Sequence, residues 1–154
     1  MSERIRDVTV APPPATPSSS LIRPTFGLLA GLGITALIAG LGIIIATLAM
    51  LRGVADPKTF VQSQSDLLVY LAIIGVGTFA GGWATSRITA GRSFFTVFVL
   101  ALILFMSAVV VVFRGSDGPA RPQWYLLSQA AIVLVSSLLG GYLERRGQAR
   151  AREG

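Results

Sequence analysis

The sequence predicts an all-α integral membrane protein, a bundle of four transmembrane helices. Hydrophobic residues make up 53% of the 154 residues, and charged residues only 13%, whereas a soluble domain carries about 25% charged residues. The chain contains four long apolar runs, and about 20 apolar residues suffice for a helix to cross a bilayer. The basic residues outnumber the acidic ones by 13 to 7, but they flank these runs, which is typical of membrane proteins and does not favour a nucleic-acid partner.

The chain divides into a polar tail, a membrane domain and a second tail. The first tail contains the segment APPPATPSSS, whose prolines and small polar residues have nothing to bury and predict disorder. A cleaved signal peptide is the alternative, but the apolar run that follows is too long for one. The expected parts are a cytoplasmic tail at 1–24, a membrane domain at 25–146 and a basic cytoplasmic tail at 147–154. The expected spans are residues 26–51, 67–86, 94–113 and 124–143.

Small residues recur at helical spacing in three of the four runs. Lipid supplies no hydrophobic force between helices, so close packing of small residues is the usual way in which membrane helices associate. In the first run Gly27, Gly31, Thr35 and Ala39 lie four apart. The residues expected to pack helix against helix are Gly27, Gly31, Gly77, Gly81, Gly82, Ser136, Gly140 and Gly141.

The inner ends of the second and fourth runs resemble each other. Each ends in two glycines, an aromatic residue and then arginine, and Gly81 and Gly82 correspond to Gly140 and Gly141 at an offset of 59. This echo suggests two related helical hairpins in parallel orientation, with the second and fourth spans packing alike. The first and third spans do not correspond at this offset, because the third has no glycine.

The distribution of basic residues predicts the orientation. Nine arginines lie on the side of the two termini, and four basic residues lie on the other side. Because cytoplasmic segments carry the excess of lysine and arginine, both termini should be cytoplasmic, in a bacterial inner membrane. Aromatic and basic residues near the span ends are the expected interface anchors: Trp83, Arg87, Trp124, Tyr125, Tyr142, Arg145 and Arg146.

The sequence contains few side chains that could catalyse a reaction or bind a metal. It has no cysteine and no histidine, which excludes thiol chemistry and Ser-His hydrolysis and removes the commonest metal ligands. No ionisable residue lies deep in a span, although proton-coupled transporters usually keep one there. We therefore expect no catalytic, cofactor-binding or metal-binding residue, and no cofactor. An enzyme acting on lipids would depend on Asp66, Asp117 and Glu144 alone.

The remaining polar side chains of the spans are uncharged. Serine and threonine hydroxyls usually return to a backbone carbonyl one turn back in the same helix. We expect this of the hydroxyls at Thr35, Thr47, Thr78, Ser107, Ser136 and Ser137. At the outer end of the second span, Ser65 and Asp66 are candidates to cap the helix.

The chain resembles a loose group of small, uncharacterised bacterial inner-membrane proteins with four helices. The residues that carry the resemblance are Gly81, Gly82, Arg87, Trp124, Tyr125, Gly140, Gly141 and Arg146. It covers roughly residues 66–146, and it implies the architecture without implying an activity.

The predicted spans have many small residues that could pack against other helices, but they have no catalytic group. This combination favours a non-enzymatic role. We expect a structural or accessory subunit that docks onto partner membrane helices through small-residue faces. The alternative is a small homo-oligomeric channel or transporter. In either case the partners are the lipid bilayer and a membrane protein or a second copy of the chain.

Overall fold

The computed structural model describes residues 18–52, 62–89, 94–114 and 122–153, which form four helices. These are α1 (Ser18–Leu51), α2 (Gln64–Ile88), α3 (Phe94–Arg114) and α4 (Gln123–Glu153). The described ranges contain no strand. The predicted all-α fold with four helices is therefore confirmed, and each helix covers one of the four apolar runs.

Three of the helices are long and apolar enough to cross a membrane. They contain the segments Ile22–Leu51, Gln64–Ile88 and Gln123–Ala151. At about 1.5 Å per residue, even the shortest of these exceeds the roughly 30 Å of a hydrocarbon core. The apolar segment of α3, Phe94–Val110, is shorter. Length and composition thus support a membrane location, and the fourth span stays a prediction.

Helix α1 begins inside the predicted tail. It starts at Ser18, so it includes residues 18–24 of the segment that we expected to be disordered. Pro24 lies within it and has no N–H to donate to the carbonyl one turn back. The first turns of α1 therefore lack one backbone hydrogen bond that the rest of the helix has.

Most of the other helix ends lie within three residues of the predicted span ends, but α4 extends ten residues further than its span. The cap of α2 is Ser63 rather than Ser65, and Asp66 completes a capping box by accepting the N–H of Ser63 at 2.8 Å. Helix α4 continues to Glu153, through the segment expected to be a separate basic tail. Glutamate, arginine, glutamine and alanine predominate there, and all four favour a helix.

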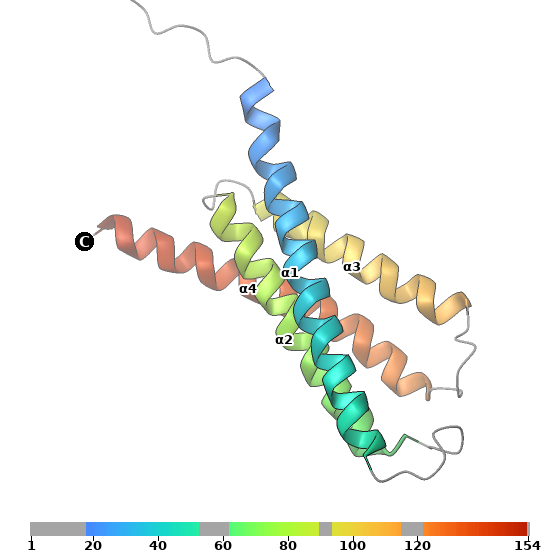
Figure 1. The fold of residues 1–154 in the computed structure, drawn as a ribbon. Coiled ribbons are helices and arrows are strands. Elements are labelled where there is room, and N and C mark those ends of the chain that lie inside the picture. The colour runs from blue at the N-terminus through green and yellow to red at the C-terminus, as the bar shows by residue number, and fades with distance from the viewer. Residues whose placement is uncertain (1–17, 53–61, 90–93, 115–121, 154) are drawn as a thin grey trace, which may run out of the picture.

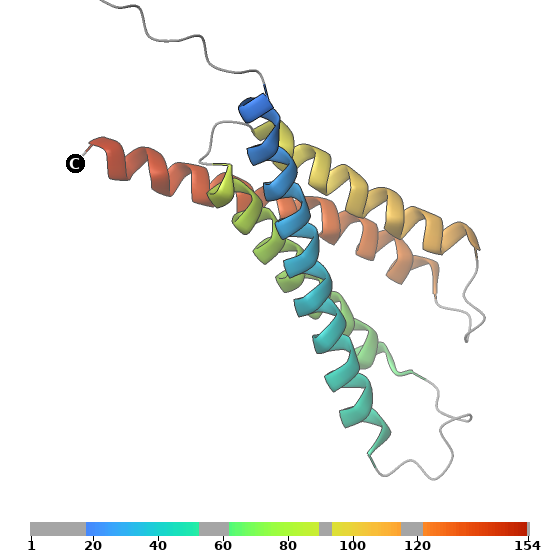
Figure 2. The same ribbon diagram turned by 45° about the horizontal axis from the view of Figure 1, so that its top comes forward.

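The four helices form two antiparallel hairpins that cross at an angle (Figures 1 and 2). Helices α1 and α2 make one hairpin, and α3 and α4 make the other. Helix α2 is the centre of the bundle, because it packs extensively against both α1 and α4, while α3 packs mainly on α4. As a result, most of α1 lies against α2 alone and keeps a broad face free.

A compact apolar cluster joins three helices near the start of α2. Leu67, Tyr70 and Leu71 of α2 surround Tyr125 of α4, and Ile43 and Met50 of α1 pack against them. Tyr125 is among the largest fully buried side chains that the structure describes. This cluster fixes the start of α4 on the start of α2.

Candidate functional site

The contact between α1 and α2 follows the ladder of small residues predicted in the first span. A Cβ atom at Gly27 would lie 2.8 Å from Cγ2 of Thr89, and one at Gly77 would lie 3.0 Å from Cβ of Ala39. Between these positions, a Cβ atom at Gly31 would overlap Oγ1 of Thr85 and lie 2.9 Å from the carbonyl oxygen of Gly81. The helices run antiparallel here, with backbone next to backbone.

The contact between α2 and α4 is equally close. A Cβ atom at Gly82 would overlap the carbonyl oxygen of Ser137 and lie 2.8 Å from its carbonyl carbon. A Cβ atom at Gly140 would overlap the carbonyl oxygen of Phe79. The obstacle is backbone in both cases, so neither neighbour can move aside as a flexible side chain would.

These two contacts are symmetric at an offset that differs from the one in the sequence. Gly82 contacts Ser137, and Phe79 contacts Gly140. The two contacts are equivalent if Gly82 corresponds to Gly140 and Phe79 to Ser137, which is an offset of 58. The sequence echo has an offset of 59 and pairs Gly81 with Gly140. In the structure, however, Gly81 faces Thr35 and Gly31 of α1 while Gly140 faces α2. The two glycine pairs therefore do not occupy equivalent environments.

The remaining predicted packing residues face neighbouring helices as well. A Cβ atom at Gly141 would lie 2.5 Å from Cγ1 of Val97 in α3. Ser136 faces α2, where its Oγ would lie 3.6 Å from a Cβ atom at Gly75. The expected residues are thus distributed over three interfaces within the chain.

Two hydrogen-bonding contacts link α1 to α2, and sequence reasoning missed both of them. The hydroxyl of Thr85 lies 3.1 Å from the carbonyl oxygen of Gly27 in α1 and 2.9 Å from that of Gly81 in its own helix. Near the other end, the hydroxyls of Tyr70 and Thr47 lie 2.8 Å apart. Thr85 continues the four-residue spacing of Gly77 and Gly81, and this spacing could have predicted that it faces the same helix.

The other hydroxyls largely follow the prediction. Thr47, Thr78, Ser107 and Ser137 donate to carbonyl oxygens one turn back, at 2.8 to 3.0 Å. Ser136 departs from the prediction, because its hydroxyl makes no hydrogen bond to a described residue. Thr35 departs from it as well, since its buried Oγ1 has no hydrogen-bond partner among the described residues. It lies against Gly81, where a Cβ atom would overlap it.

The predicted interface anchors fall into three groups, two of which are pairs of neighbouring side chains. Trp83 is partly exposed, and the guanidinium of Arg87 lies over its ring, 4.9 Å from the ring centroid. Trp124 is exposed to a similar degree and meets Tyr125 edge to face, with centroids 6.1 Å apart. Tyr125 itself is buried in the cluster with Leu67, so its ring does not face the surroundings as we expected of an anchor.

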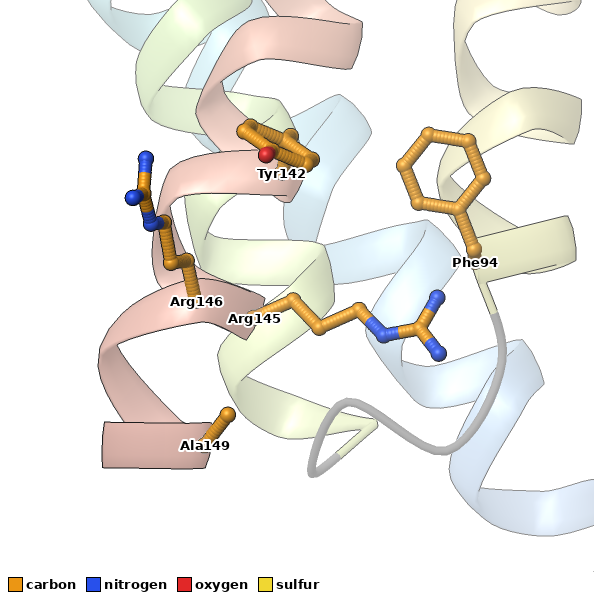
Figure 3. Close-up of a pocket in the computed structure, with 5 residues that line it drawn as sticks. All are labelled: Phe94, Tyr142, Arg145, Arg146 and Ala149. Carbon is orange, nitrogen blue, oxygen red and sulfur yellow. The ribbon is translucent and has the colours of Figure 1, made fainter. Parts of the chain in front are cut away.

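Tyr142, Arg145 and Arg146 lie together in the C-terminal half of α4. With Ala149 and with Phe94 of α3, they line an open pocket of about 520 Å³ (Figure 3). Among the described residues, no carboxylate lines this pocket. Asp66 lies in the first turn of α2 and Glu144 lies in α4, while Asp117 falls outside the described residues. The described part of the chain brings no three acidic side chains together.

Helix α1 presents an apolar face that points away from the bundle. This outward face consists of Gly33, Leu37, Gly40, Leu41, Ile44 and Leu48. Its leucines and its isoleucine are more than half exposed. No described residue lies within 4 Å of a Cβ atom placed at Gly33 or Gly40. These two glycines therefore differ from the others of α1, all of which have neighbours on α2.

No protein-family model, curated protein or solved structure matches the chain. The resemblance to small four-helix membrane proteins therefore extends to the architecture alone.

Proposed function

We propose that this protein is a non-enzymatic accessory subunit of a bacterial inner-membrane assembly. It crosses the membrane four times with both termini in the cytoplasm, and it docks onto an apolar helix of a partner membrane protein. The outward face of α1 is the docking surface. The single observation that carries the proposal is the pair of open glycines within this exposed apolar face.

Gly33 and Gly40 have no neighbouring helix among the described residues, whereas the predicted packing glycines already contact other helices of the same chain. Gly31 and Gly81 lie at the contact of α1 with α2, and Gly82 and Gly140 lie at the contact of α2 with α4. We infer that these residues hold the bundle together by letting backbones approach, which leaves them unavailable to a partner. Gly33 and Gly40 are seven residues apart, two helical turns, and so lie on one side of α1.

A partner helix suits this face better than lipid alone. Lipid chains cover any apolar surface, but a glycine between large side chains leaves a depression that only a closely approaching helix fills well. Leu37, Leu41 and Ile44 stand beside the two glycines and would pack on both sides of the incoming helix. The partner is therefore an apolar membrane helix with small residues of its own.

The helix arrangement is compatible with the proposed orientation. The start of α1, the end of α2, the start of α3 and the end of α4 share one end of the molecule (Figure 1). Arg23, Arg87, Arg145 and Arg146 belong to these segments. This end carries the excess of basic residues, as a cytoplasmic end does.

Purification from the source membrane in mild detergent, followed by native mass spectrometry, tests the function. We expect a complex in which this chain and one different membrane protein occur in fixed stoichiometry. The variant G33L/G40L should lose the partner but keep its helical content, because both positions are open within the chain. G147L is the matched control, since Gly147 is also open and lies on α4, away from the outward face.

Two outcomes contradict the proposal. A chain that migrates alone, without a stoichiometric partner, rules out an accessory subunit. A complex containing only copies of this chain supports the homo-oligomeric channel or transporter instead, which flux measurements in liposomes would then examine.

A further inference from the structure

The pocket at the inner end of α4 combines positive charge with aromatic walls. Arg145 and Arg146 follow Tyr142 by three and four residues, and Ala149 follows one turn later, so the two arginines flank the line from Tyr142 to Ala149 along α4. Phe94, the first residue of α3, closes the opposite side. In Figure 3 the side chain of Arg145 extends from α4 towards Phe94, and the ring of Tyr142 lies above it.

Neither arginine of the pocket is neutralised by a described acidic residue. The nearest carboxylate in sequence, that of Glu144, accepts a hydrogen bond from the side-chain amide of Gln148 at 3.1 Å. Each guanidinium has five N–H donors in a planar fork that fits the oxygens of a phosphate group. The fork of Arg145 lies on the side of Phe94 and can hold phosphate oxygens, whereas the guanidinium of Arg146 points away from Phe94 in Figure 3 and adds positive charge nearby.

The depth of the pocket matches that of a lipid headgroup. The apolar run of α4 ends at Leu143, and the first charged residues follow at once. Phe94 and Tyr142 are both substantially exposed and lie where the acyl chains of a lipid would begin. A soluble anion would gain nothing from these aromatic surfaces, because it has no apolar part.

We propose that this pocket binds the phosphate group of an anionic membrane phospholipid, with Arg145 on the phosphate, Arg146 adding positive charge beside it, and Phe94 and Tyr142 beside the upper acyl chains. Basic pockets between membrane helices on the cytoplasmic side are suited to such headgroups. The proposal requires the membrane location but not the partner protein, so it can fail or succeed independently of the docking surface of α1.

Native mass spectrometry of the purified full-length chain in mild detergent tests the proposal. The probes are phosphatidylglycerol and phosphatidylcholine with identical acyl chains, which differ in net charge. We expect phosphatidylglycerol to bind at least tenfold more tightly. R145Q/R146Q should weaken phosphatidylglycerol binding about 30-fold, since each arginine near an anionic surface contributes roughly a fivefold factor.

The matched control is R23Q/R150Q, which removes the same net charge from two exposed arginines outside the pocket. It should weaken phosphatidylglycerol binding less than threefold. R145K/R146K retains the charge but loses the planar fork, so its affinity should lie between those of the wild type and R145Q/R146Q. Circular dichroism should show unchanged helical content in all three variants.

Three results would overturn the lipid site. The first is an equal loss of binding in R23Q/R150Q and R145Q/R146Q, which would indicate general charge attraction. The second is equal binding of the two lipids. The third is displacement of phosphatidylglycerol by millimolar inorganic phosphate, which would identify a free anion as the ligand.

Discussion

Replacing Gly82 by alanine adds one methyl group at the closest approach of α2 and α4. That methyl group would overlap the carbonyl oxygen of Ser137 and would also lie 3.0 Å from the Ser137 Cα atom. Because these atoms belong to the backbone of α4, relief requires the two helices to move apart. Overpacking of this kind typically costs about 1–3 kcal/mol, so G82A should lower the free energy of unfolding by that amount.

Gly33 provides the matched control for this substitution. It also lies within a helix, but no described residue lies within 4 Å of an added Cβ atom. Alanine is favoured over glycine inside a helix by about 0.5–1 kcal/mol, so G33A should be neutral or slightly stabilising. Alanine gains this helix preference at position 82 as well, so the two variants should differ by the overpacking cost alone, about 1–3 kcal/mol.

Reversible unfolding in mixed micelles, with increasing sodium dodecyl sulfate and detection by circular dichroism, measures this difference. A difference of 1.4 kcal/mol corresponds to a factor of about ten in the unfolding equilibrium at one denaturant composition. If G82A and G33A unfolded at the same composition, the backbone contact between Gly82 and Ser137 would not exist as described.

Two further substitutions test the other interfaces with the same unfolding measurement. A Cβ atom at position 141 would lie only 2.5 Å from Cγ1 of Val97, so G141L should separate α3 from α4 and lower the free energy of unfolding by at least about 1–3 kcal/mol. Wild-type stability of G141L would refute this contact. Y70F removes the hydroxyl that lies 2.8 Å from that of Thr47 and should cost about 0.6 kcal/mol, and at most about 1.7 kcal/mol, as is typical of hydrogen bonds between membrane helices. The double variant Y70F/T47A should then cost little more than the separate effect of T47A, whereas full additivity would exclude a direct link.

Hydropathy sufficed to predict the existence and the approximate positions of the helices. Predicted spans at 67–86 and 94–113 correspond to helices at Gln64–Ile88 and Phe94–Arg114. This agreement follows from the physics of lipid, in which a long apolar segment has to satisfy its backbone hydrogen bonds internally. The same reasoning fails outside the apolar runs. Helix α4 continues to Glu153 because its polar residues favour a helix by themselves, which hydropathy does not register.

The partners of each small residue were beyond the reach of sequence spacing. Spacing of four identifies a face of a helix, but it does not identify the helix that covers that face. Gly81 and Gly82 are adjacent in sequence and therefore point about 100° apart, which allows one to face α1 and the other α4. Tyr125 shows the same limit, since its position near a span end suggested an anchor, while the cluster around Leu67 buries it.

The two glycine pairs resemble each other in sequence, but they do not occupy equivalent positions in the structure. Helices α2 and α4 contact each other symmetrically, but at an offset of 58 rather than 59. The small residues expected to receive a partner are engaged within the chain. In our proposal the partner binds the outward face of α1, which the spacing of four did not single out.

A photo-cross-linking scan along α1 in the source membrane tests the docking surface most directly. A photoreactive amino acid would replace each residue from 33 to 48 in turn, and cross-links to other proteins would be quantified. Efficient cross-linking to one protein should recur every three to four residues, at Gly33, Leu37, Gly40 or Leu41, Ile44 and Leu48, and should be weak at Thr35, Ala39 and Gly42, which face α2. Cross-linking only to lipid, or equal cross-linking to protein at every position, would contradict a partner helix on this face.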